Sequence, residues 1–216
     1  AVSGNSNVLV AYFSWSGHGR QMANWVAEET GGELFRIVPE VLYGEDFDTV
    51  ANRAQTELND GTRPALSAHI DPEIMAKYDI IYLGFPIWWY DLPTPVWSFL
   101  EEYDLSGKTI IPFFSHAGSS NGANSLNRLT SLATGATVLI SSHLLGEMEQ
   151  MVTQVGIIHH GKMLFEGALR DLKRHSRGDI LLRVLDVPRA LAALRQNGVA
   201  VCEEEGLLRL PPMEDE

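Results

Sequence analysis

Up to about residue 140, short apolar runs alternate with segments whose apolar residues recur at helical spacing. The apolar runs are Val8–Phe13, Glu33–Val38, Ile80–Phe85, Thr109–Phe114 and Ala136–Ile140. The helical segments between them are Gln21–Thr30, Asp48–Asn59, Pro95–Glu102 and Asn121–Ala133. Strands that alternate with helices predict an α/β fold, in which a parallel sheet carries helices on both faces. The runs at 80–85 and 109–114 lack clean alternation, which is typical of central strands buried on both sides.

Three segments that follow apolar runs carry unusual chemistry: Ser14–Gly19, Pro86–Pro93 and Ser115–Gly122. In sheets of this kind, ligands bind at the carboxyl ends of the strands, near the point where the strand order reverses. We therefore expect all three segments to lie along one edge of the sheet and to form a common site.

The first of these loops has the composition of a phosphate site. A buried strand that leads through hydroxyl residues and glycines into a helix offers free backbone N–H groups and a positive dipole end to a dianion. The same residues are common in helix-capping turns, so the loop alone leaves both interpretations open. With its two companions we favour the phosphate site. Its candidate groups are the hydroxyls of Ser14 and Ser16, the N–H groups of Gly17, His18 and Gly19, and the side chain of Arg20.

Four pieces of the chain, 8–17, 84–89, 105–113 and 115–122, resemble the flavodoxin family. With their spacing they cover roughly residues 7–139. The resemblance implies a flavodoxin-like three-layer sandwich, whose five-stranded parallel sheet has the order 2-1-3-4-5. It also implies noncovalent FMN, with its phosphate on the first loop and its isoalloxazine ring against the other two. One departure is Gly19, because the family commonly has a third hydroxyl residue there, and a lower FMN affinity is expected.

The second and third loops then supply the expected ring contacts. Three adjacent aromatic residues cannot all face inward from one extended segment, because successive side chains alternate sides. At least one ring should therefore face the loop edge and stack on the isoalloxazine, and which one stays open. Pro86 would stiffen this platform. The candidate contacts are Pro86, Ile87, Trp88, Trp89 and Tyr90, followed by Ser115, His116, Ala117, Gly118, Ser119 and Gly122.

His116 is expected to bind at the edge of the ring rather than to transfer protons, and we name no catalytic residue and no metal ligand. Tyr43, in the acidic stretch Glu40–Asp60, could approach the flavin as similar loops do in related proteins. These roles rest on the resemblance.

The net negative charge of the chain argues against two classes of binding partner, nucleic acids and anionic membranes. The chain has 16 Lys and Arg against 28 Asp and Glu, a formal net charge of −12. Nucleic-acid and anionic membrane surfaces both need clustered basic residues, so we expect neither partner. No apolar run approaches the ~20 residues of a membrane-spanning helix. We expect a cytoplasmic protein, and an exported form stays open because the first residue is not methionine.

Cys202 is the single cysteine, which excludes an internal disulfide and a CxxC redox pair. Redox chemistry therefore needs a bound cofactor.

After residue 139 the sequence changes character. Residues 137–149 and 155–167 look like the C-terminal piece of an ABC-transporter ATPase, with His143 in the place of its switch histidine. The phosphate loop of such an ATPase requires GxxxxGK[ST]. The nearest candidate, Gly107-Lys108-Thr109, has Glu102 where the first glycine should be. We therefore do not expect ATP hydrolysis.

We interpret the chain as a fusion joined near Thr137–Ile140, with an FMN-binding domain at 1–141 and an ABC-derived appendage at 142–216. In the first domain Ala136–Ser141 would be the fifth strand, followed by a helix at Leu144–Val152. The appendage would contain a β-hairpin at 155–166, a linker at 173–178 and a small α/β tail at 179–210. The tail would comprise Ile180–Val184, a helix at Pro188–Gln196, Val199–Glu203 and Leu207–Leu210.

The sequence thus predicts an FMN-binding electron carrier that serves a redox partner protein or a small-molecule acceptor, with the oligomeric state left open. Its acidic balance and aromatic stacking both disfavour the reduced, anionic flavin, which predicts a low potential. Two alternatives stay open: an FMN-dependent NAD(P)H:quinone-type reductase, and a non-catalytic binding module of an ABC assembly that rests on residues 137–170.

Overall fold

The computed structural model describes residues 7–118, 122–141, 152–175, 180–204 and 206–210. The chain forms two compact units, 1–151 and 152–216. Each unit is described by itself.

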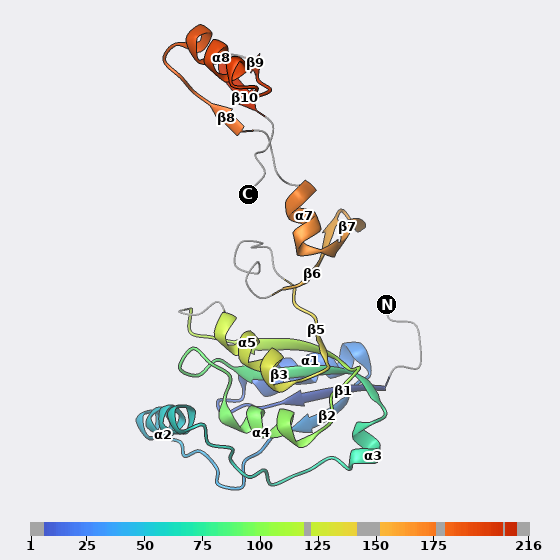
Figure 1. The fold of residues 1–216 in the computed structure, drawn as a ribbon. Helices are drawn as coiled ribbons and strands as arrows, with labels where there is room; N and C mark the ends of the chain where they lie inside the picture. The colour runs from blue at the N-terminus through green and yellow to red at the C-terminus, as the bar shows by residue number, and fades with distance from the viewer. Residues whose placement is uncertain (1–6, 119–121, 142–151, 176–179, 205, 211–216) are drawn as a thin grey trace. The chain divides into compact units, whose positions relative to one another are not determined.

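The first unit contains a five-stranded parallel sheet in the order β2-β1-β3-β4-β5 (Figure 1). Both the architecture and the strand order that the sequence predicts are confirmed. The strands are β1 (Asn7–Tyr12), β2 (Glu33–Arg36), β3 (Tyr78–Pro86), β4 (Thr109–Ser115) and β5 (Thr137–Val138).

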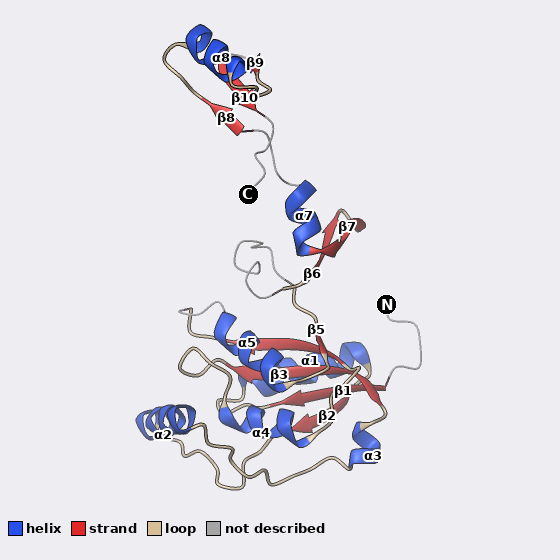
Figure 2. Ribbon diagram, viewed as in Figure 1, coloured by secondary structure: helices blue, strands red, loops and turns tan. Residues whose placement is uncertain are grey.

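Helices lie on both faces of this sheet (Figure 2). They are α1 (His18–Thr30), α2 (Phe47–Asp60), α3 (Pro72–Met75), α4 (Thr94–Glu102) and α5 (Ala123–Leu132). Successive side chains of β1 point to opposite faces of the sheet, so they belong to two separate hydrophobic clusters. Val10 and Tyr12 pack with Ala23 of α1, whereas Leu9 and Ala11 belong to the larger cluster that includes α4 and α5.

The fifth strand pairs with β4 in this first sheet, as the proposed join requires. Thr137 donates its N–H to the carbonyl of Lys108 at 2.9 Å, and Leu139 donates to Ile110 at 2.9 Å. The strand proper spans only Thr137–Val138, shorter than the expected 136–141. Most of the helix expected at Leu144–Val152, and the switch position His143, lie outside the described residues.

The second unit begins with a hairpin of β6 (Gln154–His159) and β7 (Lys162–Ala168), which pair antiparallel. It continues with α7 (Leu169–His175), β8 (Ile180–Leu182), α8 (Val187–Gln196), β9 (Cys202–Glu204) and β10 (Leu207–Leu210). The last three strands form an antiparallel sheet in the order β8-β10-β9. The expected linker at 173–178 is wrong at its start, since α7 continues to His175. The derivation of 142–216 from an ATPase as one appendage stays a prediction.

Candidate functional site

The first loop connects β1 to α1 through a left-handed glycine. Gly17 has φ 92° and caps the helix without a side-chain hydrogen bond. Gln21 donates to the carbonyl of Gly17 at 3.2 Å, which closes the first helical turn. The N–H groups of His18, Gly19 and Arg20 precede that bond, so they have no partner within the helix. A helix start with this geometry can accept an anion.

Ser14 and Gly19 face each other across this loop. Ser14 is only 6% exposed, and its hydroxyl has no hydrogen-bond partner among the described residues. A Cβ at position 19 would lie 3.2 Å from both Cβ and Oγ of Ser14. A side chain at position 19 would therefore require Ser14 to shift by a few tenths of an ångström.

The other polar groups of the first loop are more exposed. Ser16 Oγ lies 2.9 Å from His18 Nδ1. Arg36, at the end of β2, donates to the carbonyl of Ser14 at 3.5 Å, so a guanidinium lies beside the loop. Arg36 could not be predicted from the sequence, because nothing in the pattern of β2 indicates which loop its last residue reaches.

The second loop forms a tight turn, and the expectation of an extended aromatic segment is wrong. Trp89 and Tyr90 have φ 49° and 64°. Trp88 and Asp91 exchange two backbone hydrogen bonds across them, of 3.1 and 2.9 Å. Positive φ at both central residues is the signature of a type I′ turn, which strongly prefers Asn, Asp and Gly. Trp and Tyr give no such signal.

The three aromatic rings of this loop have different surroundings. Trp88 packs edge-to-face against Phe13 at 5.2 Å and against Tyr43 at 5.0 Å, measured between ring centroids. Trp89 and Tyr90 are 47% and 54% exposed. Trp89 Nε1 donates to the carbonyl of Ala51 in α2 at 2.8 Å, which fixes the ring at the surface. Trp89 and Tyr90 are thus the rings that the turn presents to solvent.

Tyr43, the third member of this aromatic cluster, is anchored by a polar network behind it. Its hydroxyl donates to Glu57, a carboxylate that also accepts from Thr94 Oγ1 at 2.6 Å. Arg53 pairs with Glu57 at 2.7 Å and places its guanidinium 4.0 Å from the centre of the Tyr43 ring. Burial, followed by the hydrogen bond to Glu57, raises the pKa of Tyr43 above its ordinary value. The network holds a neutral phenol under Trp88.

Asp91 ends the turn and connects it to α5. One carboxylate oxygen accepts from the N–H of Leu92 at 2.7 Å, and the other accepts from Arg128 Nη2 at 3.0 Å. The guanidinium of Arg128 also lies 4.5 Å from the centre of the Trp97 ring. This pair could not be predicted from the sequence, because 37 positions separate its members.

The third loop leads from β4 to α5. It is joined to the second loop where Ile87 donates its N–H to the carbonyl of Ser115 at 2.9 Å. His116 Nδ1 accepts from the N–H of Gly118 at 2.9 Å, which leaves the ring proton on Nε2. Gly122 caps α5 with φ 80°, and a Cβ there would lie 2.7 Å from the Phe114 ring. Ser119 lies outside the described residues.

The structure brings the predicted residues to one edge of the sheet, because all three loops follow the carboxyl ends of adjacent strands β1, β3 and β4. Ile87 and Trp88 pack against the core of the first unit. Whether these residues bind a ligand is not tested by their placement, and that role stays a prediction.

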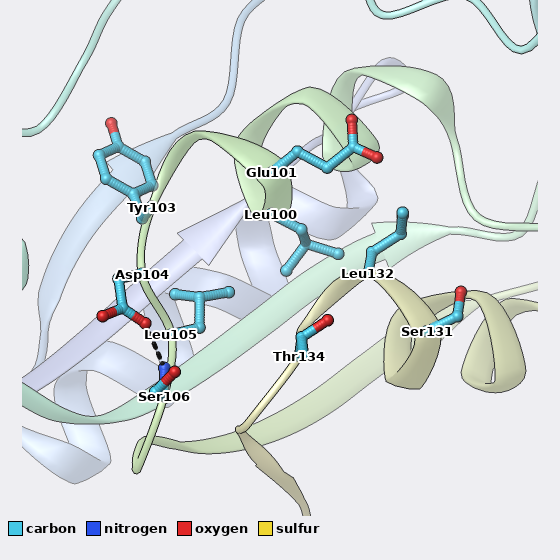
Figure 3. Close-up of a pocket in the computed structure, with 9 residues that line it drawn as sticks. All are labelled: Leu100, Glu101, Tyr103, Asp104, Leu105, Ser106, Ser131, Leu132 and Thr134. Carbon is cyan, nitrogen blue, oxygen red and sulfur yellow. Dashed lines mark hydrogen bonds between the residues drawn. The ribbon is translucent and has the colours of Figure 1, made fainter.

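A shallow hollow of ≈ 440 Å³ lies at the opposite edge, where α4 and α5 end (Figure 3). Its two carboxylates already have partners: Glu101 pairs with Arg63 at 2.7 Å, and Asp104 accepts from the N–H of Ser106 at 3.0 Å.

Lys108, the basic residue of the incomplete phosphate-loop motif, is buried. Its ammonium donates to the carbonyls of Tyr78 at 2.6 Å and Met75 at 3.0 Å. The lysine therefore joins the starts of β3 and β4 rather than facing a nucleotide.

Comparison with known proteins gives the family. The flavodoxin family model matches residues 7–154. The chain belongs to the flavodoxin family. Among solved structures, a protein named as a flavoprotein from Bacteroides uniformis ATCC 8492 is 36% identical, with a TM-score of 0.57. The match covers 63% of this flavodoxin-family chain and 88% of that one.

A flavoprotein from Lactobacillus acidophilus NCFM, solved in complex with FMN, is 26% identical to this flavodoxin-family chain, with a TM-score of 0.53. The match covers 62% of this chain and 90% of that one.

Two curated relatives belong to another class. The bacitracin transport ATP-binding protein BcrA of Bacillus licheniformis is 41% identical over 61 residues, which is 28% of this chain and 20% of BcrA. An uncharacterized ABC transporter ATP-binding protein, YcbN of Bacillus subtilis (strain 168), is 49% identical over 39 residues, 18% of this chain and 13% of that protein. The chain thus spans a fifth or less of these proteins. In the part of the chain that the structure describes, no helix has the length and apolar character needed to cross a membrane.

Proposed function

We propose that this protein binds FMN noncovalently at the carboxyl edge of the first sheet and carries single electrons to a partner protein or a small-molecule acceptor. The observation that carries the proposal is the pairing of two features: an uncapped helix start beside Ser14, whose hydroxyl has no hydrogen-bond partner among the described residues, and a neighbouring turn that exposes two aromatic rings. A relative of the same fold was solved with FMN.

The first loop fits a phosphate monoester. Ser14 contributes a hydroxyl that has no hydrogen-bond partner among the described residues, and Gly19 places no side chain beside it. Ser16, Gly17, His18 and Arg20 would complete the phosphate contacts, and Arg36 adds a positive charge beside the loop. Backbone N–H groups at a helix start favour a dianion over a neutral hydroxyl.

The second and third loops fit a flat, apolar ring. Trp89 and Tyr90 offer exposed aromatic faces, while Trp88 packs against Phe13 and Tyr43. Backbone groups near His116 and Gly118 lie on the adjoining loop and would contact the ring edge. Bound FMN supplies the redox chemistry. The protein positions the ring and, through its net charge of −12, disfavours the reduced anion, so a low potential follows.

Titration of the flavin-free chain with FMN and riboflavin tests the binding. We expect FMN to bind and riboflavin to bind more weakly, because riboflavin lacks the phosphate. Ser14→Ala should weaken FMN binding by about tenfold, the loss of one charge-assisted hydrogen bond, and leave riboflavin unchanged. Ser106→Ala, a serine at the opposite edge, is the matched control. A chain that binds neither flavin would refute the proposal.

Steady-state oxidation of NAD(P)H by the FMN-loaded protein separates a carrier from a reductase. A carrier shows no sustained turnover without a partner enzyme. Robust NAD(P)H oxidation with a quinone would contradict the carrier role while leaving FMN binding intact. Tight ATP binding by the flavin-free chain would instead favour the ABC binding module.

A further inference from the structure

The Trp88–Asp91 turn has a backbone that its own residues do not favour. Left-handed φ values are routine for glycine and uncommon for bulky side chains, because Cβ then approaches the following carbonyl oxygen. Here two aromatic residues adopt them in succession. Such strain persists only where surrounding contacts hold it, and it concentrates at functional sites.

Two of the contacts that hold the turn come from other elements. Trp89 Nε1 bonds to the carbonyl of Ala51 in α2 at 2.8 Å. Asp91 pairs with Arg128 of α5 at 3.0 Å, and its side chain is only 19% exposed. The pairing is therefore less screened by solvent than a fully exposed one.

Arg128 is itself held in place. Its guanidinium lies 4.5 Å from the centre of the buried Trp97 ring, an attractive cation–π arrangement. Arg128 belongs to α5, which begins directly after the third loop. The Asp91–Arg128 pair therefore connects the second loop to the element that carries the third loop.

We propose that Asp91 and Arg128 are a positioning pair: they keep the Trp89–Tyr90 turn in its strained form and fix the spacing between the two loops that would enclose the flavin ring. This inference rests on the proposed FMN site. It assigns no catalytic role to either residue. Without Arg128 the turn can relax, and the negative charge of the Asp91 carboxylate is no longer balanced by a guanidinium.

Arg128→Gln is the test variant, and Arg63→Gln is its matched control. Arg63 lies over the same Trp97 ring, at 4.8 Å, and also forms an ion pair, but with Glu101 rather than with the turn. The control therefore removes a cation–π contact to the same ring and an ion pair, here a bidentate one, without touching the second loop. Arg128→Lys keeps the charge and should recover part of the binding.

In Arg128→Gln we expect FMN and riboflavin affinities to fall by the same factor, about tenfold, because the ring and not the phosphate is affected. The midpoint potential of the bound flavin should become more negative, since a positive charge is lost. Arg63→Gln should change either affinity by less than about twofold. In a double-mutant cycle, Asp91→Asn should add little once Arg128 is replaced.

Equal losses of flavin affinity in Arg128→Gln and Arg63→Gln would overturn the inference, because a general effect on stability would then suffice. The result can be separated from a failure of the proposed function by hydrogen exchange on the flavin-free protein. The Asp91 amide, which donates to Trp88, should exchange faster in Arg128→Gln than in Arg63→Gln even if no flavin binds. Equal exchange would show that the pair does not hold the turn.

Discussion

Each of the two units makes a two-residue turn with the same backbone signature and a different sequence. In the first unit Trp89 and Tyr90 have φ 49° and 64° between the bridged residues Trp88 and Asp91. In the second unit His160 and Gly161 have φ 47° and 72° at the tip of the β6–β7 hairpin. The hairpin places glycine where the turn type prefers it, and the other turn places a tyrosine there.

The difference shows which turn is stabilised locally and which is stabilised by its surroundings. A non-glycine residue in the left-handed region costs roughly 1–2 kcal/mol. The hairpin avoids this cost at its second position. The aromatic turn has this cost at both central residues, and its conformation depends on the hydrogen bond to Ala51 and the ion pair with Arg128. Strain of this kind at a candidate ligand site is consistent with a functional requirement for the two exposed rings.

Exchanging the aromatic turn for the sequence that its backbone prefers gives the largest expected effect. In the double variant Trp89→Asn with Tyr90→Gly, we expect FMN affinity to fall by about a hundredfold, because both exposed rings are lost. The free energy of unfolding should rise by about 1 kcal/mol as the strain is relieved. Flavin titration and thermal unfolding of the flavin-free protein measure the two effects.

Trp25→Asn is the control for loss of an exposed tryptophan, since Trp25 lies on α1 at 56% exposure, outside the three loops. A double variant that binds FMN as tightly as the original would show that the rings have no binding role. The backbone strain of the aromatic turn would then have no explanation in flavin binding.

The alternation of buried strands and periodic helices predicts the parallel sheet with helices on both faces, and the resemblance to the flavodoxin family predicts its strand order. The same pattern locates all three loops. It fails where a structure depends on distant contacts: the left-handed turn follows residues without a turn signal, and Asp91 meets Arg128 across 37 positions. The helix α3 was missed because four residues are too few to show a helical period.

Replacing the glycine of the hairpin turn gives the next largest expected effect. Gly161→Ala places a Cβ in the left-handed region, where nothing within 4 Å opposes it sterically, so the cost comes from the backbone alone. We expect the hairpin to lose about 1 kcal/mol of local stability, measured by hydrogen exchange at β6 and β7. Flavin binding should not change.

Gly156→Ala is the control within the same hairpin. Gly156 has no positive φ, and its added Cβ would meet Met163 at an ordinary 3.5 Å. If both variants lose equal stability, the left-handed backbone at Gly161 is not the cause, and the contrast between the two turns loses its basis.

Alkaline pH should distinguish the units through Tyr43, which supports Trp88 behind the aromatic turn. Because burial and Glu57 raise the pKa of Tyr43, the unfolded chain releases this proton first as pH increases. The stabilisation of the folded state by the protonated Tyr43 is fully present below pH 10. It is lost as the pH rises toward the pKa of Tyr43 in the folded protein. Between pH 10 and 11 the loss should be up to about 1 kcal/mol for this group.

Tyr43→Phe should remove that part of the pH dependence, as measured by denaturant unfolding of the first unit at each pH. Tyr78 and Tyr103, whose pKa values are raised to about 12, provide a background that stays in both proteins. Residues 152–216 contain no tyrosine, so hydrogen exchange of the hairpin should lack this transition. An unchanged pH profile in Tyr43→Phe would contradict the assignment.

The smallest expected effect is the salt dependence of the ion pair that holds the aromatic turn. Raising the ionic strength from about 0.1 to 1 M shortens the screening length from about 10 to 3 Å. Riboflavin is the ligand to use, because it carries no phosphate whose own attraction salt would weaken. The original protein should lose up to about twofold in riboflavin affinity relative to Arg128→Gln, in which the pair is absent. If the two proteins respond identically, the Asp91–Arg128 contact acts through hydrogen-bond geometry rather than charge, and short-range contacts alone hold the aromatic turn against its backbone preference.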